Sequence, residues 1–249
     1  MRYGKIIVLA ALLGMTACKN EQKGQDVTQT GEKTVEKTEV AEKNVVRKRI
    51  STAADFSYIT NLGSVDIIYT QGDYNLEAEG DSVTLNFLKT EIDSHLLTVT
   101  VHTDNNTDLN QYGNTSNIKL YVSCPELRCV SICGNGSFTS KGPWNAEQLQ
   151  FGGMGTGELN VEQVECQKCD IQTNDVGKIT FGELKAKDVM LLSYGSADID
   201  LNILADSLMV LNEGKQHLHL KGNVQTAIIK RQDDPNLVNE LNVLPYKKK

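Results

Sequence analysis

Aromatic side chains are scarce in this sequence: Phe, Trp and Tyr make up 6% of its 249 residues, and Trp144 is the single tryptophan. Small-molecule and sugar-binding clefts depend on aromatic walls, so this scarcity weakens the case for a glycan-binding cleft. Two common signatures of catalysis are also missing, because the chain has neither a Gly-x-Ser-x-Gly elbow nor a Gly-rich phosphate loop. We therefore predict no catalytic residue and no cofactor.

Apolar runs are too short to span a bilayer, which requires about 20 residues. The run from Ile6 to Leu13 follows Arg2 and Lys5 and precedes small residues that end at Cys18. This order is typical of a secretory signal peptide, which we place at residues 1–17. A cysteine at this position resembles the bacterial lipobox and predicts lipidation of Cys18. Ordinary signal cleavage beside an incidental cysteine is the alternative.

Basic residues are fewer than acidic ones in this sequence. Removal of residues 1–17 takes away two basic and no acidic residues, so Lys and Arg fall from 25 to 23 against 32 Asp and Glu, a net charge of −9. Such a chain lacks the basic surface that nucleic acid requires and is repelled by anionic lipid. We expect no nucleic-acid partner, and contact with a membrane through the N-terminal lipid.

Residues 18–49 differ in composition from the rest of the chain. Lys, Glu, Gln, Thr and Gly dominate there, and large apolar side chains are almost absent. Such a segment buries too little surface to become ordered. We predict a lipidated, disordered tether over 18–49, a folded domain over 50–243 and a polar tail over 244–249. The start Lys19-Asn-Glu21 resembles surface-export signals of Bacteroidetes lipoproteins, so the outer membrane is the expected site of anchoring, facing either the surface or the periplasm.

After the signal the sequence has no 3.6-residue periodicity and instead repeats itself from residue 127 onward. Apolar anchors recur at spacings of 19, 20, 20, 19 and 19 residues, at Ile132, Phe151, Ile171, Leu191, Val210 and Ile229. Other apolar columns lie two, five and seven residues before the anchors and eight and ten after them. Within each piece the alternation has period 2, which indicates β-strands.

Three short strands per repeat cannot bury a face alone. Stacking successive coils about 4.8 Å apart places each apolar side chain on its equivalent in the next coil. The sequence therefore predicts an all-β fold, a single-stranded parallel β-helix of 19–20-residue coils. Residues Ile50 to Val122 are strand-like but less regular, and we interpret them as irregular N-terminal entry coils of the same solenoid. A separate β-sandwich is the alternative.

The order of several short motifs resembles one protein family. The motifs are Tyr69–Asp73, Leu88–Ile92, Leu97–Val99, Ile118–Val122 and Gly134–Phe138, with Pro125 and Leu127 between the last two. In this order the chain resembles the head GIN domain of putative autotransporter adhesins, over about residues 50 to 240. The resemblance implies a right-handed β-solenoid on secreted or lipid-anchored proteins that are common in Bacteroidetes. It assigns no biochemical activity, because fold alone does not fix function.

One outward-facing patch has residue types that bind metals. His217 and His219 flank the inward Leu218, and the repeat places Asp198 and Asp200 one coil earlier. Neighbouring rungs lie about 4.8 Å apart, a spacing at which two histidines and two carboxylates could hold Zn²⁺ or a similar ion. A solvated polar patch is the favoured interpretation, and the metal site is the alternative. The two aspartates are also the candidate carboxylates of an enzyme that acts on polysaccharide.

Five cysteines follow Cys18. Cys166 and Cys169 fall in core columns and are interpreted as small buried hydrophobic residues instead of a metal or redox motif. Cys129 and Cys133 are expected to face outward about 13 Å apart, which is too far for a disulfide. Cys124 could pair with Cys129 across a turn, so the connectivity stays open.

A glycine-rich run, Gly152–Asn160, is close to the calcium-binding nonapeptide of toxin β-rolls. Its sixth position is Gly157 where the motif requires an aspartate, and the pattern occurs once. Without that carboxylate the calcium loses its main ligand, so we predict a glycine-rich turn.

The main functional hypothesis is a non-enzymatic, lipid-anchored envelope protein whose solenoid surface binds or adheres to a glycan or another protein. Solenoids offer extended surfaces in place of deep pockets. The alternatives are a polysaccharide-acting enzyme on a β-helix and a structural periplasmic envelope protein whose solenoid edge pairs with a partner strand. The residue pattern identifies neither the binding residues nor the oligomeric state.

Overall fold

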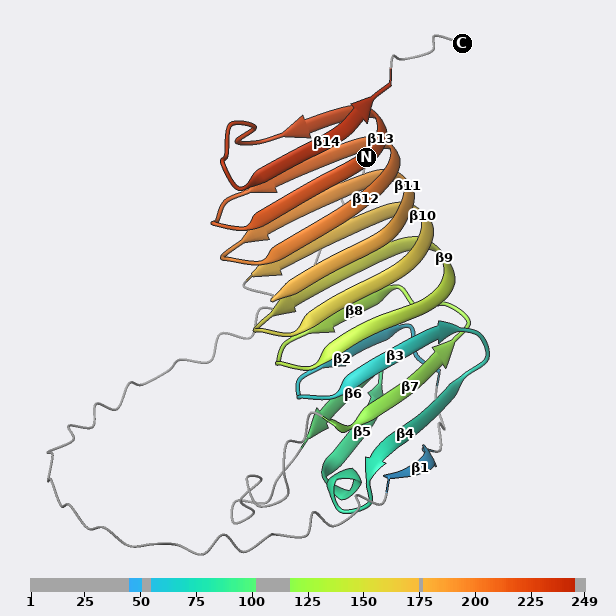
Figure 1. The fold of residues 1–249 in the computed structure, drawn as a ribbon. Helices are drawn as coiled ribbons and strands as arrows, with labels where there is room; N and C mark the ends of the chain where they lie inside the picture. The colour runs from blue at the N-terminus through green and yellow to red at the C-terminus, as the bar shows by residue number, and fades with distance from the viewer. Residues whose placement is uncertain (1–44, 51–54, 102–116, 175–176, 245–249) are drawn as a thin grey trace, which may run out of the picture. The chain divides into compact units, whose positions relative to one another are not determined.

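The computed structural model describes residues 45–50, 55–101, 117–174 and 177–244 (Figure 1). These residues fall in one compact unit, Glu42–Lys249. They form strands and one short 3₁₀ helix, Thr84–Phe87, arranged as a β-solenoid of about 6 turns of roughly 20 residues. The predicted all-β solenoid is confirmed. The predicted signal peptide and Cys18 lie outside the described residues.

The C-terminal part of the solenoid is a regular parallel stack. Strands β9 (Ser137–Met154), β10 (Glu158–Asn174), β11 (Lys178–Tyr194), β12 (Asp198–Asn212), β13 (His217–Ile229) and β14 (Leu237–Val243) each pair in parallel with the next. Figure 1 shows them as successive rungs that curve around a shared interior. The predicted column Phe151, Ile171, Leu191, Val210 and Ile229 is confirmed residue by residue.

The first anchor was wrong by two residues. Val130, not Ile132, pairs with Phe151, so the first spacing in this column is 21 residues instead of 19. The coils then shorten to 20 residues between Phe151 and Ile171 and to 19 between Leu191 and Val210. The pairing register shifts after Val161 and after Phe181, where one strand holds an extra residue at its bend. Val130 and Ile132 are both apolar and buried, so alternation alone could not distinguish them.

The entry coils belong to the same sheet, which excludes the β-sandwich. Strands β2 (Tyr58–Asn61) and β3 (Asp66–Gln71) pair in parallel with β8 (Cys129–Ile132) and β9 on one side. On the other side they pair in parallel with β6 (Leu96–Val101) and β7 (Lys119–Cys124). The first coil in sequence is therefore the second in space, between the β6–β7 coil and the regular stack.

Antiparallel strands cover the N-terminal end of the stack. Strand β4 (Asn75–Asp81) pairs with β7, β5 (Leu88–Asp93) pairs with β6, and β1 (Val45–Ile50) pairs with β4. Because β1 starts at Val45, residues 45–49 of the predicted tether are a strand, which corrects that boundary. Opposite charges favour the pairing: Arg47 lies 2.7 Å from Glu77 and its guanidinium lies 4.2 Å from the centre of the Tyr121 ring. The last strand, β14, ends at Val243.

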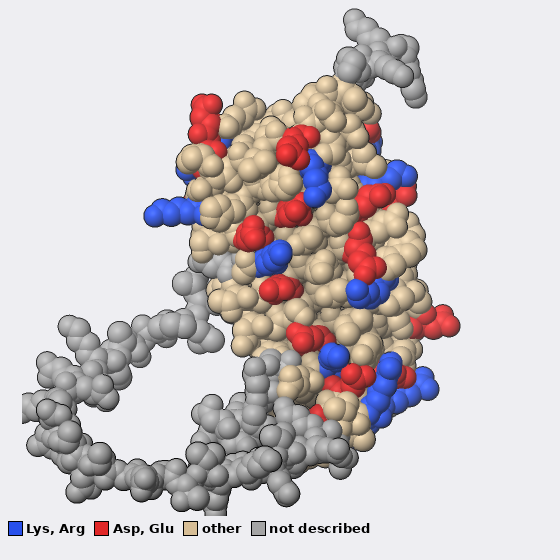
Figure 2. Space-filling model, in the orientation of Figure 1, with Lys and Arg blue, Asp and Glu red and all other residues tan. Residues whose placement is uncertain are grey.

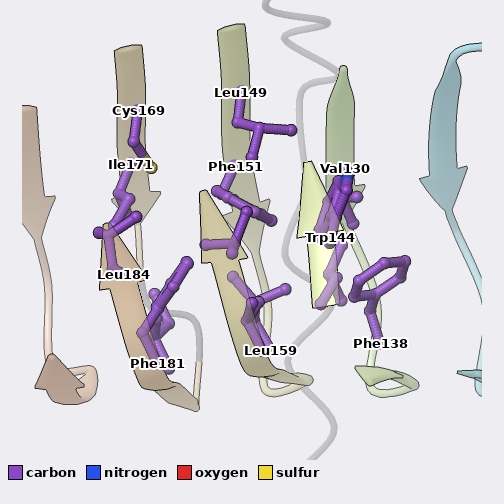
Figure 3. Packing of buried hydrophobic residues seen from close by; sticks show 14 of the residues in the cluster. Val130, Phe138, Trp144, Leu149, Phe151, Leu159, Cys169, Ile171, Phe181 and Leu184 are labelled. Atoms are coloured by element: carbon purple, nitrogen blue, oxygen red, sulfur yellow. The ribbon is translucent and has the colours of Figure 1, made fainter. Parts of the chain in front are cut away.

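Large side chains fill the interior near the junction of the two parts (Figure 3). The Trp144 ring is 1% exposed and lies 5.0 Å from Tyr69 and 5.6 Å from Phe151, measured between ring centroids. Phe151 in turn meets Phe181 edge to face at 5.1 Å. This cluster joins an entry coil to the third rung of the regular stack, so both parts share one core.

Candidate functional site

The sheet register brings together the four residues of the predicted metal patch. Asp198 pairs with His217, and Asp200 pairs with His219. His219 Nδ1 lies 3.6 Å from a carboxylate oxygen of Asp200, and its Nε2 lies 3.2 Å from Glu240 on the last rung. The sequence reasoning placed the pairs correctly but missed Glu240, although the 21-residue step from His219 puts it within one rung.

Charge pairing accounts for much of this patch without a metal. Lys221 Nζ lies 3.2 Å from Asp200, so this carboxylate is shared between a lysine and His219. Nowhere in the described ranges do three or more His, Cys, Asp or Glu side chains gather in a way that could hold a metal ion. Zinc binding at Asp198, Asp200, His217 and His219 therefore stays the alternative to a solvated polar patch, and the use of Asp198 and Asp200 as catalytic carboxylates stays a second alternative.

Charged residues of both signs alternate over the outer surface (Figure 2). Several pairs connect one rung to the next: Lys141 lies 2.6 Å from Glu162, and Lys185 lies 2.7 Å from Glu165. Hydrogen bonds from the Gly142 backbone N–H and the Lys141 side chain lower the pKa of Glu162. Each such exposed pair adds little stability, but together they give the outer face a mixed polar character.

One part of the outer surface is apolar. Met190, Met209 and Ile228 form one outward column on β11, β12 and β13, and Leu192 and Leu211 form a second column beside it. Met209 is 40% exposed and Ile228 is 62% exposed, while the other three are half-buried. We name these five residues the apolar face. The sequence contains the signal for this face, because its residues directly precede or follow the inward anchors, at positions −1 and +1.

The edge strand β14 mixes polar and apolar residues, and one of its backbone N–H groups is hydrogen-bonded within the strand. The Leu241 backbone N–H donates to the Asn239 side chain at 3.2 Å, which removes one donor from the open edge. Val238 and Val243 are 52% and 59% exposed. An edge with exposed apolar side chains and few blocking charges is a surface on which another strand can pair.

All five described cysteines are free thiols. Cys166 and Cys169 are buried in the core, as predicted, and Cys133 is exposed. Cys124 is buried whereas Cys129 is only half-buried on the outer face, so the possible Cys124–Cys129 pairing is not formed. Burial raises the pKa of the Cys124 thiol to about 12 and also raises the pKa of Cys129.

The glycine-rich run is a corner of the solenoid. A Cβ on Gly157 would lie 2.3 Å from the carbonyl oxygen of Gly136 in the preceding coil. A side chain cannot fit there, so the aspartate of the calcium motif cannot either. A cavity of about 10 Å³, lined by residues that include Ile132, Phe151 and Leu159, has room for about one water molecule and is too small for a ligand.

Comparison with known proteins identifies the fold family. A family model described as "Putative auto-transporter adhesin, head GIN domain" matches residues 55–182, just over half of the chain. No curated protein matches the chain. None of the described elements is a helix with the length and apolar character needed to cross a membrane.

Several solved structures share the fold at low sequence identity. A "putative adhesin" from Bacteroides fragilis is 19% identical, with a TM-score of 0.62 over 73% of this chain and 85% of that one. A "putative adhesin" from Parabacteroides merdae is 17% identical, with a TM-score of 0.54 over 80% of this chain and 95% of that one. A "putative lipid binding protein" from Parabacteroides distasonis is 19% identical, with a TM-score of 0.51 over 74% of this chain and 79% of that one. At these identities the likeness establishes the fold alone. The family model, which matches more than half of the chain, shows that the chain belongs to the auto-transporter adhesin head GIN domain family.

Proposed function

We propose that this protein is a lipid-anchored adhesin of the outer membrane, joined to the membrane at Cys18, whose solenoid surface binds a glycan or a protein on another surface. Its membership of an adhesin family supports an adhesion-like role at the cell envelope. The observation that carries the proposal is the stacking in register of outward residues over the successive rungs β9 to β13. Such a surface is long and regular, which suits an extended ligand better than a small substrate.

The described surface also favours binding over catalysis. Asp200, a candidate carboxylate for polysaccharide cleavage, lies beside Lys221 and His219 on an outer strand face. Glycosidases instead place two carboxylates on opposite sides of a bound sugar, within a cleft. The family and its structural neighbours point in the same direction, toward a protein without enzymatic activity.

Anchoring and adhesion can be tested together with one variant. Cells that produce the Cys18→Ala protein should release it into the soluble fraction and adhere less to glycan-coated or protein-coated surfaces than cells that produce the wild type. The Gly72→Ala variant is the matched control, since a Cβ there meets nothing within 4 Å and the anchor is left intact. Equal adhesion by wild-type and Cys18→Ala cells, at equal protein levels, would refute the proposal.

A second candidate function is direct contact with lipid, which the apolar face favours. A structural neighbour is described as a lipid-binding protein, and the apolar face exposes Met209 and Ile228. Purified Cys18→Ala protein, which cannot carry the lipid, should then sediment with neutral phosphatidylcholine vesicles, and the same protein with Met209→Lys and Ile228→Lys added should not. Lys185→Glu in the same background, on another outer column of β11, is the control. Absence of sedimentation of the Cys18→Ala protein would exclude this function.

A further inference from the structure

Two cysteines meet at a corner of the solenoid. Strand β10 bends from one face of the solenoid to the next between Cys166 and Cys169, and its pairing with both β9 and β11 skips Gln167 at the bend. Both cysteine side chains turn into the core, with exposures of 5% for Cys166 and 0% for Cys169. A pair that would be far apart in a straight strand is brought together by this bend.

Both thiols lie on the inner side of the same corner, separated along the chain only by Gln167 and Lys168. A hydrogen bond from the neighbouring thiol lowers the pKa of Cys166, and the same interaction together with burial raises the pKa of Cys169. Cys166 is thus the thiol that ionises first, and its sulfur is the nearer of the two to solvent.

Packing alone does not require sulfur at this corner. The equivalent residues are Ala146 and Leu149 in β9, and Ala186 and Val189 in β11. The same corner is therefore built from aliphatic side chains on both sides. Among these three rungs only β10 has two cysteines at this corner, and both side chains turn inward there.

We propose that Cys166 and Cys169 are a redox-active pair that closes into a disulfide bond when the protein meets an oxidised dithiol or a small disulfide. The Cys166 thiolate attacks a sulfur of the external disulfide, forms a mixed disulfide and releases one thiolate. Cys169 then attacks the Cys166 sulfur, forms the internal bond and releases the second thiolate. The protons of both cysteines leave on the two released thiols, so one external disulfide is reduced for each bond formed.

The bond closes a short loop at the corner. Its expected effect is local: in the chain-entropy account, closing a loop of this length lowers the equilibrium constant for unfolding roughly 20-fold. The proposal is independent of the adhesive function, because it concerns the chemistry of one corner and not the outer surface.

The sequence provides a direct assay. Trypsin cleaves after Lys168, between the two cysteines, so peptides 142–168 and 169–178 stay joined only if the disulfide exists. The purified full chain is equilibrated with oxidised and reduced glutathione, denatured in N-ethylmaleimide to block free thiols, digested and analysed by mass spectrometry. We expect the two peptides to appear joined without reductant and separate after reduction. Cys129 and Cys133, which share another tryptic peptide, serve as internal controls: each should carry either the label or glutathione, with no bond between them.

A matched variant excludes other pairings. Cys166→Ala places the residue of β9 and β11 at this corner, so it should fold, and Cys169 should then carry the label in full. Recovery of both peptides separately and fully labelled from the oxidised wild type would overturn the proposal. Recovery of Cys169 joined to any cysteine other than Cys166 would overturn it as well.

Discussion

Replacing Leu191 by alanine should strongly destabilise the solenoid. Leu191 is 0% exposed and lies in the middle of the anchor column, between Ile171 and Val210. A buried Leu→Ala change costs about 2–5 kcal/mol, because transfer free energy is lost and a cavity is left between packed rungs. This is a large part of the about 5–15 kcal/mol that stabilises an ordinary domain.

The adjacent residue provides the control. Leu192 has the same side chain but points outward and is half-buried, so Leu192→Ala should cost less than about 1 kcal/mol. Urea unfolding is followed by the fluorescence of Trp144, which is 1% exposed and the only tryptophan, and by circular dichroism in case coils unfold separately. Equal costs for the two variants would refute the assignment of inward and outward faces.

Three further predictions concern single positions. Burial raises the pKa of Cys124 from 9.0 to about 12, so the thiol ionises in the unfolded chain at a lower pH than in the folded protein. The free energy of unfolding should therefore be constant below pH 9 and fall as the pH rises toward 12. The urea midpoint should fall over this window, and less steeply in Cys124→Ala. Gly157→Ala should lower the Tm because its Cβ would meet backbone at 2.3 Å, whereas Gly72→Ala, with nothing within 4 Å, should not; equal Tm values would show that the corner is not close-packed. The His217→Ala, His219→Ala double variant should bind as much zinc in equilibrium dialysis as the wild type, and a loss of one bound ion would establish a metal site.

The regular coils were predictable because each rung repeats the same inward positions. A column such as Phe151, Ile171 and Leu191 is visible in sequence, since an in-register parallel stack places equivalent residues over one another. The first spacing failed because Val130 and Ile132 are both buried, so a shift of two keeps every side chain on its correct face.

The strand order at the N-terminal end could not be predicted from the sequence, because it depends on non-local pairing. The insertion of β2 and β3 between the β6–β7 coil and the regular stack depends on contacts between segments far apart in the chain, which no local pattern encodes. Strand β1 was missed for the same reason, because it is held by β4 and by Arg47 contacts with Glu77 and Tyr121.

At the candidate site, the sequence predicted which residues pair across neighbouring strands, but it did not predict the charged side chains that surround them. The pairing of Asp198 with His217 and of Asp200 with His219 followed from the repeat. Glu240 pairs with His219, and Lys221 pairs with Asp200. These contacts depend on side-chain conformation and on the position of the last strand. The placement of Cys166 and Cys169 on the inner side of one corner likewise depends on the bend of β10, which alternation does not describe.

The most direct test of the account is whether the solenoid faces the outside of the cell. Intact cells are treated with a protease too large to cross the outer membrane and blotted for the solenoid, with lysed cells and a periplasmic marker protein as controls. The account predicts loss of the protein from intact cells while the periplasmic marker survives. Full protection until lysis would contradict surface adhesion and place the solenoid in the periplasm, as a structural envelope protein.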